Sequence, residues 1–247
     1  MSARRFFVEG VRVPGESITL AGSDAHKVVH VLRLRAGDAL EVADSAGALF
    51  SVRIDDVRDG SVRATVVEPI AAVSPAADAA LRIDVAQAVP KGQKMDFVVE
   101  KTTELGAAAI LPFYCERTVV HDVGGAKLER WRRLAKTAAQ QSGRRDVPPV
   151  HDALGFHALL ARFHDYDAVL FPWELAPRTP LRETLPPLLR GARRAMIAIG
   201  PEGGFAHHEA EAAVAHGAHL LWLGSRILRT ETAALALLAV IDALAAS

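Results

Sequence analysis

The fold of this chain is decided by residues 81–111, which read LRIDVAQAVPKGQKMDFVVEKTTELGAAAIL. Residues 81–85 alternate apolar and polar side chains, as a half-buried β-strand does. Residues 91–105 carry apolar side chains at helical spacing, and Gly106 is a favourable helix stop. The apolar segment 109–111 follows as the next strand. A strand, a helix and a strand at this spacing predict a βαβ unit, and therefore an α/β domain with a mostly parallel sheet.

The segments that continue this domain are strands at 168–171, 195–199 and 219–223, and helices at 127–142, 207–216 and 231–244. The final helix is apolar on nearly every face, and such a helix is buried on more than one side. We therefore expect part of it to face a second copy of the chain. The alternative is a helix enclosed within one domain.

The first seventy residues predict a small β-barrel. Their short β-branched segments lie at 6–8, 39–42, 49–54 and 61–67, with a short helix at 25–31. Turn-forming pairs such as Gly37-Asp38 and Asp59-Gly60 separate the segments. A stretch of small residues with a proline follows. The predicted organisation is a barrel at 1–72, a linker at 73–80 and the α/β domain at 81–247.

Composition limits the class of protein. The chain has 247 residues, half of them hydrophobic, with 29 Lys and Arg against 29 Asp and Glu. A single cysteine, Cys115, excludes a disulfide framework. The ten histidines have poor spacing for metal ligands, so we expect no metal site. The longest apolar run, 233–241, is far short of the about 20 residues that span a bilayer, so we expect a cytoplasmic protein with no membrane partner.

Three apolar strands of the second half each end in an unusual loop, at 172–174, 200–205 and 224–232. In open α/β sheets, ligands bind beyond the carboxyl ends of the strands. Glycines also let a backbone approach a ligand closely. These loops therefore predict a small-molecule pocket, the alternative for each being a tight turn.

The loops match neither a P-loop nor a dinucleotide-binding glycine motif. Glu202 also stands where a phosphate site would avoid an acid. An uncharged or cationic ligand group fits better than a polyphosphate.

Basic residues gather locally although the net charge is zero. Those that indicate a surface contacting RNA phosphates are Arg4, Arg5, Arg33, Arg35, Arg132, Arg133 and Arg145. The segment 140–144, which reads QQSGR, adds hydrogen-bonding side chains beside this charge. The alternative for the helix at 127–142 is an ordinary solvated face.

Six motifs together resemble the RsmE family of 16S rRNA uracil-N3 methyltransferases, in the SPOUT superfamily. They are RRFF (4–7), HVLRLRAGD (30–38), KTTELG (101–106), QSGR (141–144), GPEGG (200–204) and LGSRILRTETA (223–233). The resemblance implies a PUA-like barrel followed by a SPOUT α/β domain with a C-terminal trefoil knot. It also implies S-adenosylmethionine as cofactor, a homodimer, and a uridine of 16S rRNA in the small ribosomal subunit as target.

The resemblance assigns the donor pocket to the ends of three strands. The residues concerned are Leu170, Phe171, Pro172, Trp173, Ile199, Gly200, Pro201, Glu202, Gly203, Gly204, Leu223, Gly224, Ile227, Leu228, Thr230 and Thr232. Methyl transfer mainly requires that two reactants be positioned, and the uracil nitrogen must lose its proton.

Arg229, Glu231 and Arg144 are the candidate catalytic residues. Arg229 would stabilise negative charge on a uracil oxygen, and Glu231 would accept a proton or orient Arg229. The alternative is that Glu231 is a favourable acid in the first turn of the last helix and Arg229 its ion-pair partner. Arg144 is a second candidate for contacting the target nucleotide.

Two positions depart from the family pattern. Gln140 stands where an acidic residue is frequent, and Ala206 replaces the hydroxyl residue of a capping box with Glu209. Two other activities remain open: ribose 2′-O-methylation within the same superfamily, and RNA binding without catalysis by an assembly factor. A metabolite-binding regulator without an RNA role is a further alternative.

Overall fold

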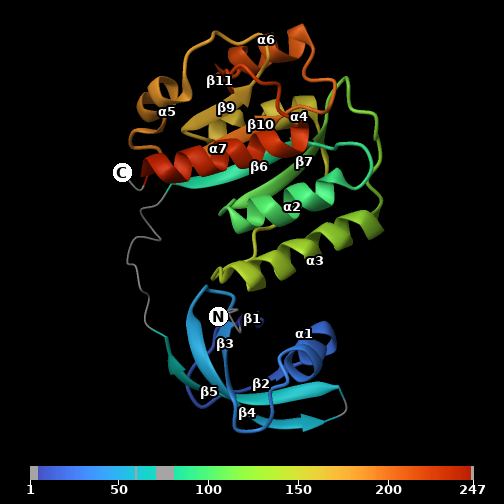
Figure 1. Cartoon of the computed structure of the whole chain (residues 1–247), viewed down its shortest axis with the longest axis vertical. Coiled ribbons are helices and arrows are strands. Elements are labelled where there is room, and N and C mark those ends of the chain that lie inside the picture. The colour runs from blue at the N-terminus through green and yellow to red at the C-terminus, as the bar shows by residue number, and fades with distance from the viewer. Residues whose placement is uncertain (1–4, 59, 71–80, 246–247) are drawn as a thin grey trace. The chain divides into compact units, whose positions relative to one another are not determined.

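The structure is a computed structural model that describes residues 5–58, 60–70 and 81–245 (Figure 1). The chain divides into two compact units, one of residues 1–75 with 139–147 and the other of residues 76–138 with 148–247. The segment 139–147, expected in the second domain, therefore belongs by its contacts to the smaller unit. The predicted linker at 73–80 lies outside the described residues.

The smaller unit contains a five-stranded curled sheet with strand order β1-β3-β4-β5-β2. Its strands are β1 (Arg5–Phe7), β2 (Ser17–Leu20), β3 (Ala39–Ala43), β4 (Leu49–Arg58) and β5 (Ser61–Pro69). Strand β1 runs parallel to β3, and the other neighbouring pairs are antiparallel. The helical segment expected at 25–31 is present as α1 (Gly22–His26) and a π-helix (Lys27–Val31).

Alternation of apolar and polar residues explains this sheet. Val52 and Ile54 on β4 and Val62 and Ala64 on β5 are buried, whereas the residues between them are more exposed. Shifts of register after Ser51 and Ile54 bend the hairpin, so one face can enclose a core. Strand β2 was not predicted because its four residues carry too short a pattern.

The larger unit is built on a six-stranded sheet in which every neighbouring pair is parallel, in the order β11-β9-β10-β6-β7-β8. The strands are β6 (Arg82–Ala88), β7 (Ala109–Tyr114), β8 (Leu154–Gly155), β9 (Ala168–Pro172), β10 (Arg194–Ile199) and β11 (Ala218–Leu221). The prediction of an α/β domain with a parallel sheet is confirmed.

The helices that follow β6 along the chain are α2 (Lys94–Glu104), α3 (Gly125–Ser142), α4 (Phe156–Leu160), α5 (Leu181–Leu189), α6 (His207–Ala215) and α7 (Thr230–Ala245), with a 3-10 turn at Phe163–Asp165. Helices α4 and α5 were not predicted. The first is a single turn, and the second carries Pro186 and Pro187 in its interior, which read as breakers in the sequence.

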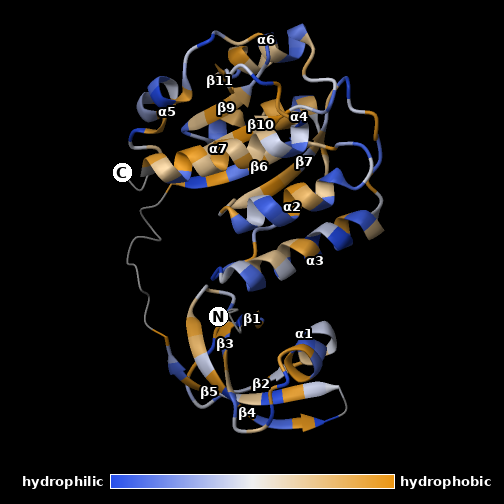
Figure 2. Cartoon of the chain, in the orientation of Figure 1, coloured by the Kyte–Doolittle hydropathy of each residue, from blue (hydrophilic) through white to orange (hydrophobic). Residues whose placement is uncertain are grey.

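Apolar layers cover both faces of the parallel sheet. On one face, Leu170 and Ile197 pack with Leu237 and Ile241 of α7 and with residues of α5. On the other face, aromatic side chains pack with α4 and α6; they include Phe113, Phe171 and Phe205. Figure 2 shows this apolar character along the strands and α7. Helix α7 also contacts α2, so part of its apolar surface is buried within the chain itself.

No helix in the described part of the chain is both long enough and apolar enough to cross a membrane.

Candidate functional site

The sheet topology brings the three predicted loops to one edge. Strand β9 lies between β11 and β10, and all three strands point the same way. The loops that follow Pro172, Ile199 and Leu221 therefore leave the same carboxyl edge side by side. The backbone N–H of Trp173 donates to the carbonyl of Leu221 at 3.0 Å, which joins the first loop to the third. We refer to this region as the candidate site.

The loop Gly200–Gly204 is tightly enclosed by its neighbours. A Cβ on Gly200 would lie 3.1 Å from the ring of Phe205, which stacks on Phe171 with ring centroids 4.1 Å apart. A Cβ on Gly203 would lie 3.3 Å from Arg117, whose guanidinium donates to the Gly203 carbonyl at 2.8 Å. Glycine at these positions therefore lets the side chains of Phe205 and Arg117 pack closely against the loop backbone.

The start of α7 is tied to this loop by a buried relay of hydrogen bonds. The hydroxyl of Thr230 donates to the carbonyl of Gly200 at 2.6 Å. The amide nitrogen of Gln87, at the end of β6, donates to the Thr230 hydroxyl at 2.8 Å. Three segments that lie far apart in the sequence thus meet at one point.

A cluster of charged groups lies outside this relay. The ammonium of Lys94 donates to Glu202 at 2.8 Å and lies 3.7 Å from Glu231. Arg229 approaches Glu231 at 3.9 Å. One cation therefore bridges the glycine loop and the first turn of α7.

Proton affinities in this charged cluster follow its contacts. The hydrogen bond to Glu202 raises the pKa of Lys94 above its usual value. Burial alone would raise the pKa of Glu202, but hydrogen bonds from Lys94 and from the backbone of Lys91 hold it below its usual value. The Lys94–Glu202 pair is therefore ionised at neutral pH.

The candidate catalytic residues lie in different surroundings. The Arg229 side chain is 82% exposed, whereas that of Glu231 is 14% exposed. One carboxylate oxygen of Glu231 is buried and has no hydrogen-bond partner in the described part of the chain. Arg144 belongs to the smaller unit, where its side chain pairs with Asp146 at 3.1 Å. Within the larger unit, the geometry brings Arg229 and Glu231 together.

The predicted donor-pocket residues divide by exposure. Leu170, Phe171, Ile199, Pro201 and Thr230 are buried in the sheet edge. Exposed or half-buried residues of the same loops are Pro172, Trp173, Gly200, Glu202, Gly203, Gly204, Leu223, Gly224, Leu228 and Thr232. Ile227 stands out because its side chain is 95% exposed, which is unusual for a large apolar residue.

The predicted RNA-contacting arginines also differ. Arg4 lies outside the described residues. Arg5 is engaged internally, since it pairs with Glu41 and donates to the carbonyls of Gly143 and Arg144. Arg33 is exposed with a φ of 56°, a left-handed conformation that is uncommon for a residue with a side chain.

The remaining arginines of that set are accessible to different degrees. Arg35 and Arg133 are exposed, and Arg145 is half-buried. Arg132 is exposed but pairs with Glu129 and Asp152.

Gln140, the departure from the family pattern, has a structural position. Its amide nitrogen donates to Asp24 at 2.9 Å, and its oxygen accepts from Lys27 at 3.2 Å. The residue is buried within the smaller unit. These contacts bind the end of α3 to α1 and the π-helix.

Sequence reasoning missed three residues that hold the candidate site, namely Gln87, Lys94 and Arg117. A fourth, Glu174, lies in the predicted loop 172–174 but was given no role. Gln87 carried a signal, because it is a polar residue at the end of an apolar strand, at the edge where ligands bind. The carboxylate of Glu174 would lie 3.1 Å from a Cβ on Gly204, so it covers that glycine. Their contacts join distant positions, so local patterns did not reveal them.

Helix α6 keeps half of its capping box. The backbone N–H of Ala206 donates to the carboxylate of Glu209 at 2.9 Å, and the same carboxylate accepts from the backbone of Glu116 at 2.8 Å. Glu209 is buried, so these bonds fix the loop before α6. The other half of the box, from a residue 206 hydroxyl to the helix, is absent because alanine has none.

We predict that Ala206→Ser stabilises the protein by about 1 kcal/mol or less, because the hydroxyl completes the capping box. Thermal unfolding measures this change. Ala215→Ser, in the last turn of the same helix, is the matched control and should be neutral or slightly destabilising. Equal effects of the two substitutions would contradict the prediction.

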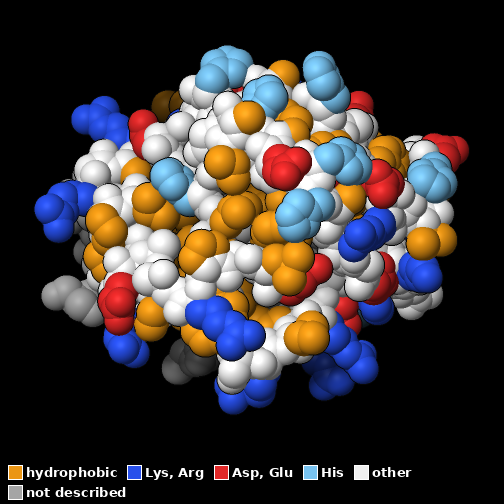
Figure 3. Space-filling model, turned by 90° about the horizontal axis from the view of Figure 1, so that it is seen from above, with side chains coloured by type: hydrophobic (Ala, Val, Ile, Leu, Met, Phe, Trp, Pro, Cys, Tyr) orange, Lys and Arg blue, Asp and Glu red, His pale blue; other side chains and the backbone are white. Residues whose placement is uncertain are grey.

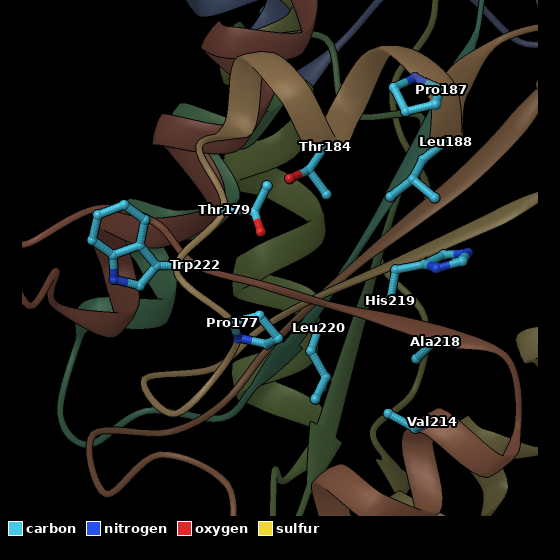
Figure 4. Close-up of a pocket in the computed structure, with 10 residues that line it drawn as sticks. All are labelled: Pro177, Thr179, Thr184, Pro187, Leu188, Val214, Ala218, His219, Leu220 and Trp222. Carbon is cyan, nitrogen blue, oxygen red and sulfur yellow. The ribbon is translucent and has the colours of Figure 1, made fainter.

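A separate cavity of about 460 Å³ lies beside the open edge of β11 (Figure 4). Its lining includes Thr184 and Leu188 of α5, His219 and Leu220 of β11, and Trp222. It is lined by none of the glycines of the candidate site.

Histidines are a visible feature of one end of the larger unit. Figure 3 shows several of their side chains among apolar ones. Among the described residues, no group of three or more His, Cys, Asp or Glu side chains is placed to hold a metal ion.

Comparison with known proteins gives consistent matches. An RNA methyltransferase domain family matches residues 77–242. The ribosomal RNA small subunit methyltransferase E of Bacillus subtilis is 32% identical over 97% of this chain and 96% of that protein. The protein of the same name from Mycobacterium tuberculosis is 30% identical over 95% of this chain and 89% of its own length.

Solved structures agree. A ribosomal RNA small subunit methyltransferase E from Neisseria gonorrhoeae, bound to S-adenosyl methionine, superposes with a TM-score of 0.85 at 28% identity, covering 98% of each chain. A Legionella pneumophila methyltransferase in complex with the same cofactor gives a TM-score of 0.79 at 27% identity, covering 99% of this chain and 98% of that one.

Proposed function

This chain belongs to the ribosomal RNA small subunit methyltransferase E family, and from that premise we propose that it transfers a methyl group from S-adenosylmethionine to N3 of a uridine in 16S rRNA. The main observation in support is that the loops following β9, β10 and β11 meet at one edge of a parallel sheet. Relatives similar over nearly the whole chain bind this donor.

The chemistry of the candidate site suits a sulfonium donor. The donor carries its own leaving group, so the protein has to position it and the acceptor rather than activate the carbon. Backbone amides and carbonyls of the loops can bind the adenine and amino acid portions. The carboxylate of Glu174 beside Gly204 favours a cationic ligand and disfavours a polyphosphate, whereas Glu202 and Glu231 are balanced by Lys94 and Arg229.

The acceptor side is assigned to Arg229 and Glu231. The exposed guanidinium of Arg229 can stabilise negative charge on a uracil oxygen as N3 loses its proton. Glu231 accepts that proton or orients Arg229. A spacing of 3.9 Å between them is long for an ion pair, which leaves Arg229 able to contact a nucleotide. Arg144 is the second proposed contact to the target.

The finer fold assignment is also a proposal: a PUA-like barrel in the smaller unit and a SPOUT domain with a trefoil knot in the larger one. Strand β11 lies at the sheet edge, yet α7, which follows it, contacts β10 and α2. The chain therefore returns past the loop Gly200–Gly204, where Thr230 bonds Gly200. A return of this kind is what a threaded chain requires.

We further propose a homodimer formed through α7. Its exposed or half-buried residues toward the C-terminal end are mostly small or apolar, namely Ala236, Ala239, Val240, Ala243 and Leu244, with Asp242 as an exposed charge among them. Leu244 is 38% exposed in the single chain. An apolar face of this kind is typical of a surface that a partner subunit covers.

The RNA-binding proposal predicts a strong dependence on salt. Exposed arginines, among them Arg33, Arg35 and Arg133, would neutralise phosphates and release counterions. Binding to a single-stranded rRNA fragment should weaken with a log–log slope of roughly −0.7 for each phosphate contacted. Fluorescence anisotropy at several salt concentrations measures this slope. A flat dependence would instead support a metabolite-binding regulator.

Mass spectrometry of nucleosides from treated rRNA tests the reaction itself. Small subunits from a strain lacking the enzyme, incubated with the purified protein and S-adenosylmethionine, should gain 3-methyluridine. A gain of a 2′-O-methyl nucleoside would support the ribose methyltransferase. RNA binding without methylation would indicate a non-catalytic assembly factor.

A further inference from the structure

Gln87 is the most deeply buried polar side chain near the candidate site. It is 0% exposed, at the carboxyl end of β6 between β10 and β7. Its amide nitrogen donates to Thr230 at 2.8 Å and to the carbonyl of Ala88 at 3.0 Å. Its amide oxygen is buried without a hydrogen-bond partner among the described residues.

Packing alone does not explain a glutamine at this place. Its neighbours along the strand, Val85, Ala86 and Ala88, are buried and apolar, so a leucine would fill similar space without burying an amide. What leucine could not supply is the hydrogen bond to Thr230. In turn, the Thr230 hydroxyl donates to the carbonyl of Gly200 at 2.6 Å. The contribution specific to Gln87 is therefore orientation of Thr230.

The same segment makes a second, charged connection to the same two elements. Lys94 bridges Glu202 of the glycine loop and Glu231 of the first turn of α7, at 2.8 and 3.7 Å. The backbone N–H of Lys91 also donates to Glu202, at 3.1 Å. Segment 87–94 therefore holds the glycine loop and the start of α7 by two sets of contacts. One is the buried, uncharged hydrogen bond of Gln87 to Thr230. The other, nearer the surface, is made by Lys91 and Lys94 to the carboxylates of Glu202 and Glu231.

We propose that segment 87–94 is a positioning element of the donor pocket, in which Gln87 acts through Thr230 on the carbonyl of Gly200. The inference rests on the proposed function. Gln87 contacts neither reactant in this arrangement; it sets the separation of two donor-binding loops. Loss of the relay should therefore weaken donor binding and raise the KM for S-adenosylmethionine, with little change of kcat at saturating donor.

A double-mutant cycle on donor binding tests this relay. Gln87→Leu and Thr230→Val should each raise the Kd for S-adenosylmethionine about tenfold, the effect of one well-placed hydrogen bond. The double variant should bind no more weakly than either single variant, because both substitutions break the same relay. Thr230→Ser, which keeps the hydroxyl, should bind within about twofold of the unchanged protein.

Thr102→Val is the matched control. Thr102 is also a fully buried threonine, and its hydroxyl donates to the carbonyl of Val98 inside α2 at 2.7 Å. This substitution removes a buried hydrogen bond of the same kind away from the pocket. We expect lower thermal stability with an unchanged Kd for the donor.

The outcomes separate the inference from the function on which it rests. If the unchanged protein binds S-adenosylmethionine but Gln87→Leu and Thr230→Val bind it equally well, Gln87 is a core residue and the inference is wrong. Additive effects in the double variant would also overturn it. If the unchanged protein binds no donor, the proposed function fails and the inference with it.

Discussion

Replacing Arg229 by alanine is expected to lower methyl transfer about 100- to 1,000-fold while S-adenosylmethionine still binds. The side chain is 82% exposed and pairs with Glu231 at the long distance of 3.9 Å, so it contributes little to folding. Its removal takes away the cation that would stabilise charge on the uracil oxygen. Single-turnover kinetics, with calorimetry of donor binding, measures the two effects separately.

Two further variants support the interpretation of this result. Arg229→Lys keeps the charge but loses the planar guanidinium, and should retain part of the activity. Arg190→Ala, at the exposed end of α5, is the control for loss of a surface arginine and should leave methyl transfer unchanged. If donor affinity falls together with activity in Arg229→Ala, Arg229 belongs to the donor pocket and not to the acceptor side.

The second large effect is expected from Gly200→Val, which should weaken donor binding more than 100-fold. Even a Cβ at this position would lie 3.1 Å from the Phe205 ring and 3.3 Å from the Gly204 backbone. That ring cannot move freely, since it stacks on Phe171 inside the core. The larger side chain therefore has to displace the loop Gly200–Gly204.

Gly155→Val is the control for this substitution. A Cβ on Gly155 meets no atom within 4 Å, so the same change there places valine in open space. We expect its donor affinity to equal that of the unchanged protein. Calorimetry at matched temperatures compares the two variants, and thermal unfolding shows whether Gly200→Val remains folded. A folded Gly200→Val protein with normal donor affinity would contradict the assigned position of the donor pocket.

The parallel sheet and its loops could be predicted because their signals are local. Alternation at 81–85, helical spacing at 91–105 and glycine-rich strand ends each lie within a few residues of one another. The elements that were missed are short, such as α4, or carry contradictory residues, such as the two prolines of α5.

The contacts that hold the candidate site could not be predicted in the same way. The relay joins Gln87 to Thr230, which are 143 positions apart, and no sequence pattern encodes such a pairing. Motifs identified the glycine loop, but the side chains that fix it, Lys94 and Arg117, come from other strand ends.

A count of basic residues in the sequence likewise does not show which arginines are exposed. Arg5 and Arg133 look alike in the sequence, but Arg5 is hydrogen-bonded to Glu41 and to backbone carbonyls, whereas Arg133 is exposed. Tertiary structure decides whether an arginine is hydrogen-bonded internally or exposed at the surface. Arg33 differs from the other exposed arginines because its backbone is in the left-handed region.

A crystal structure of this protein with S-adenosylmethionine tests the central claim most directly. The account predicts that the donor lies between the segments Leu170–Trp173, Ile199–Gly204 and Leu223–Thr232. Its methyl group should face Arg229. Donor density in the cavity between α5 and β11, or at any place away from Gly200–Gly204, would contradict it.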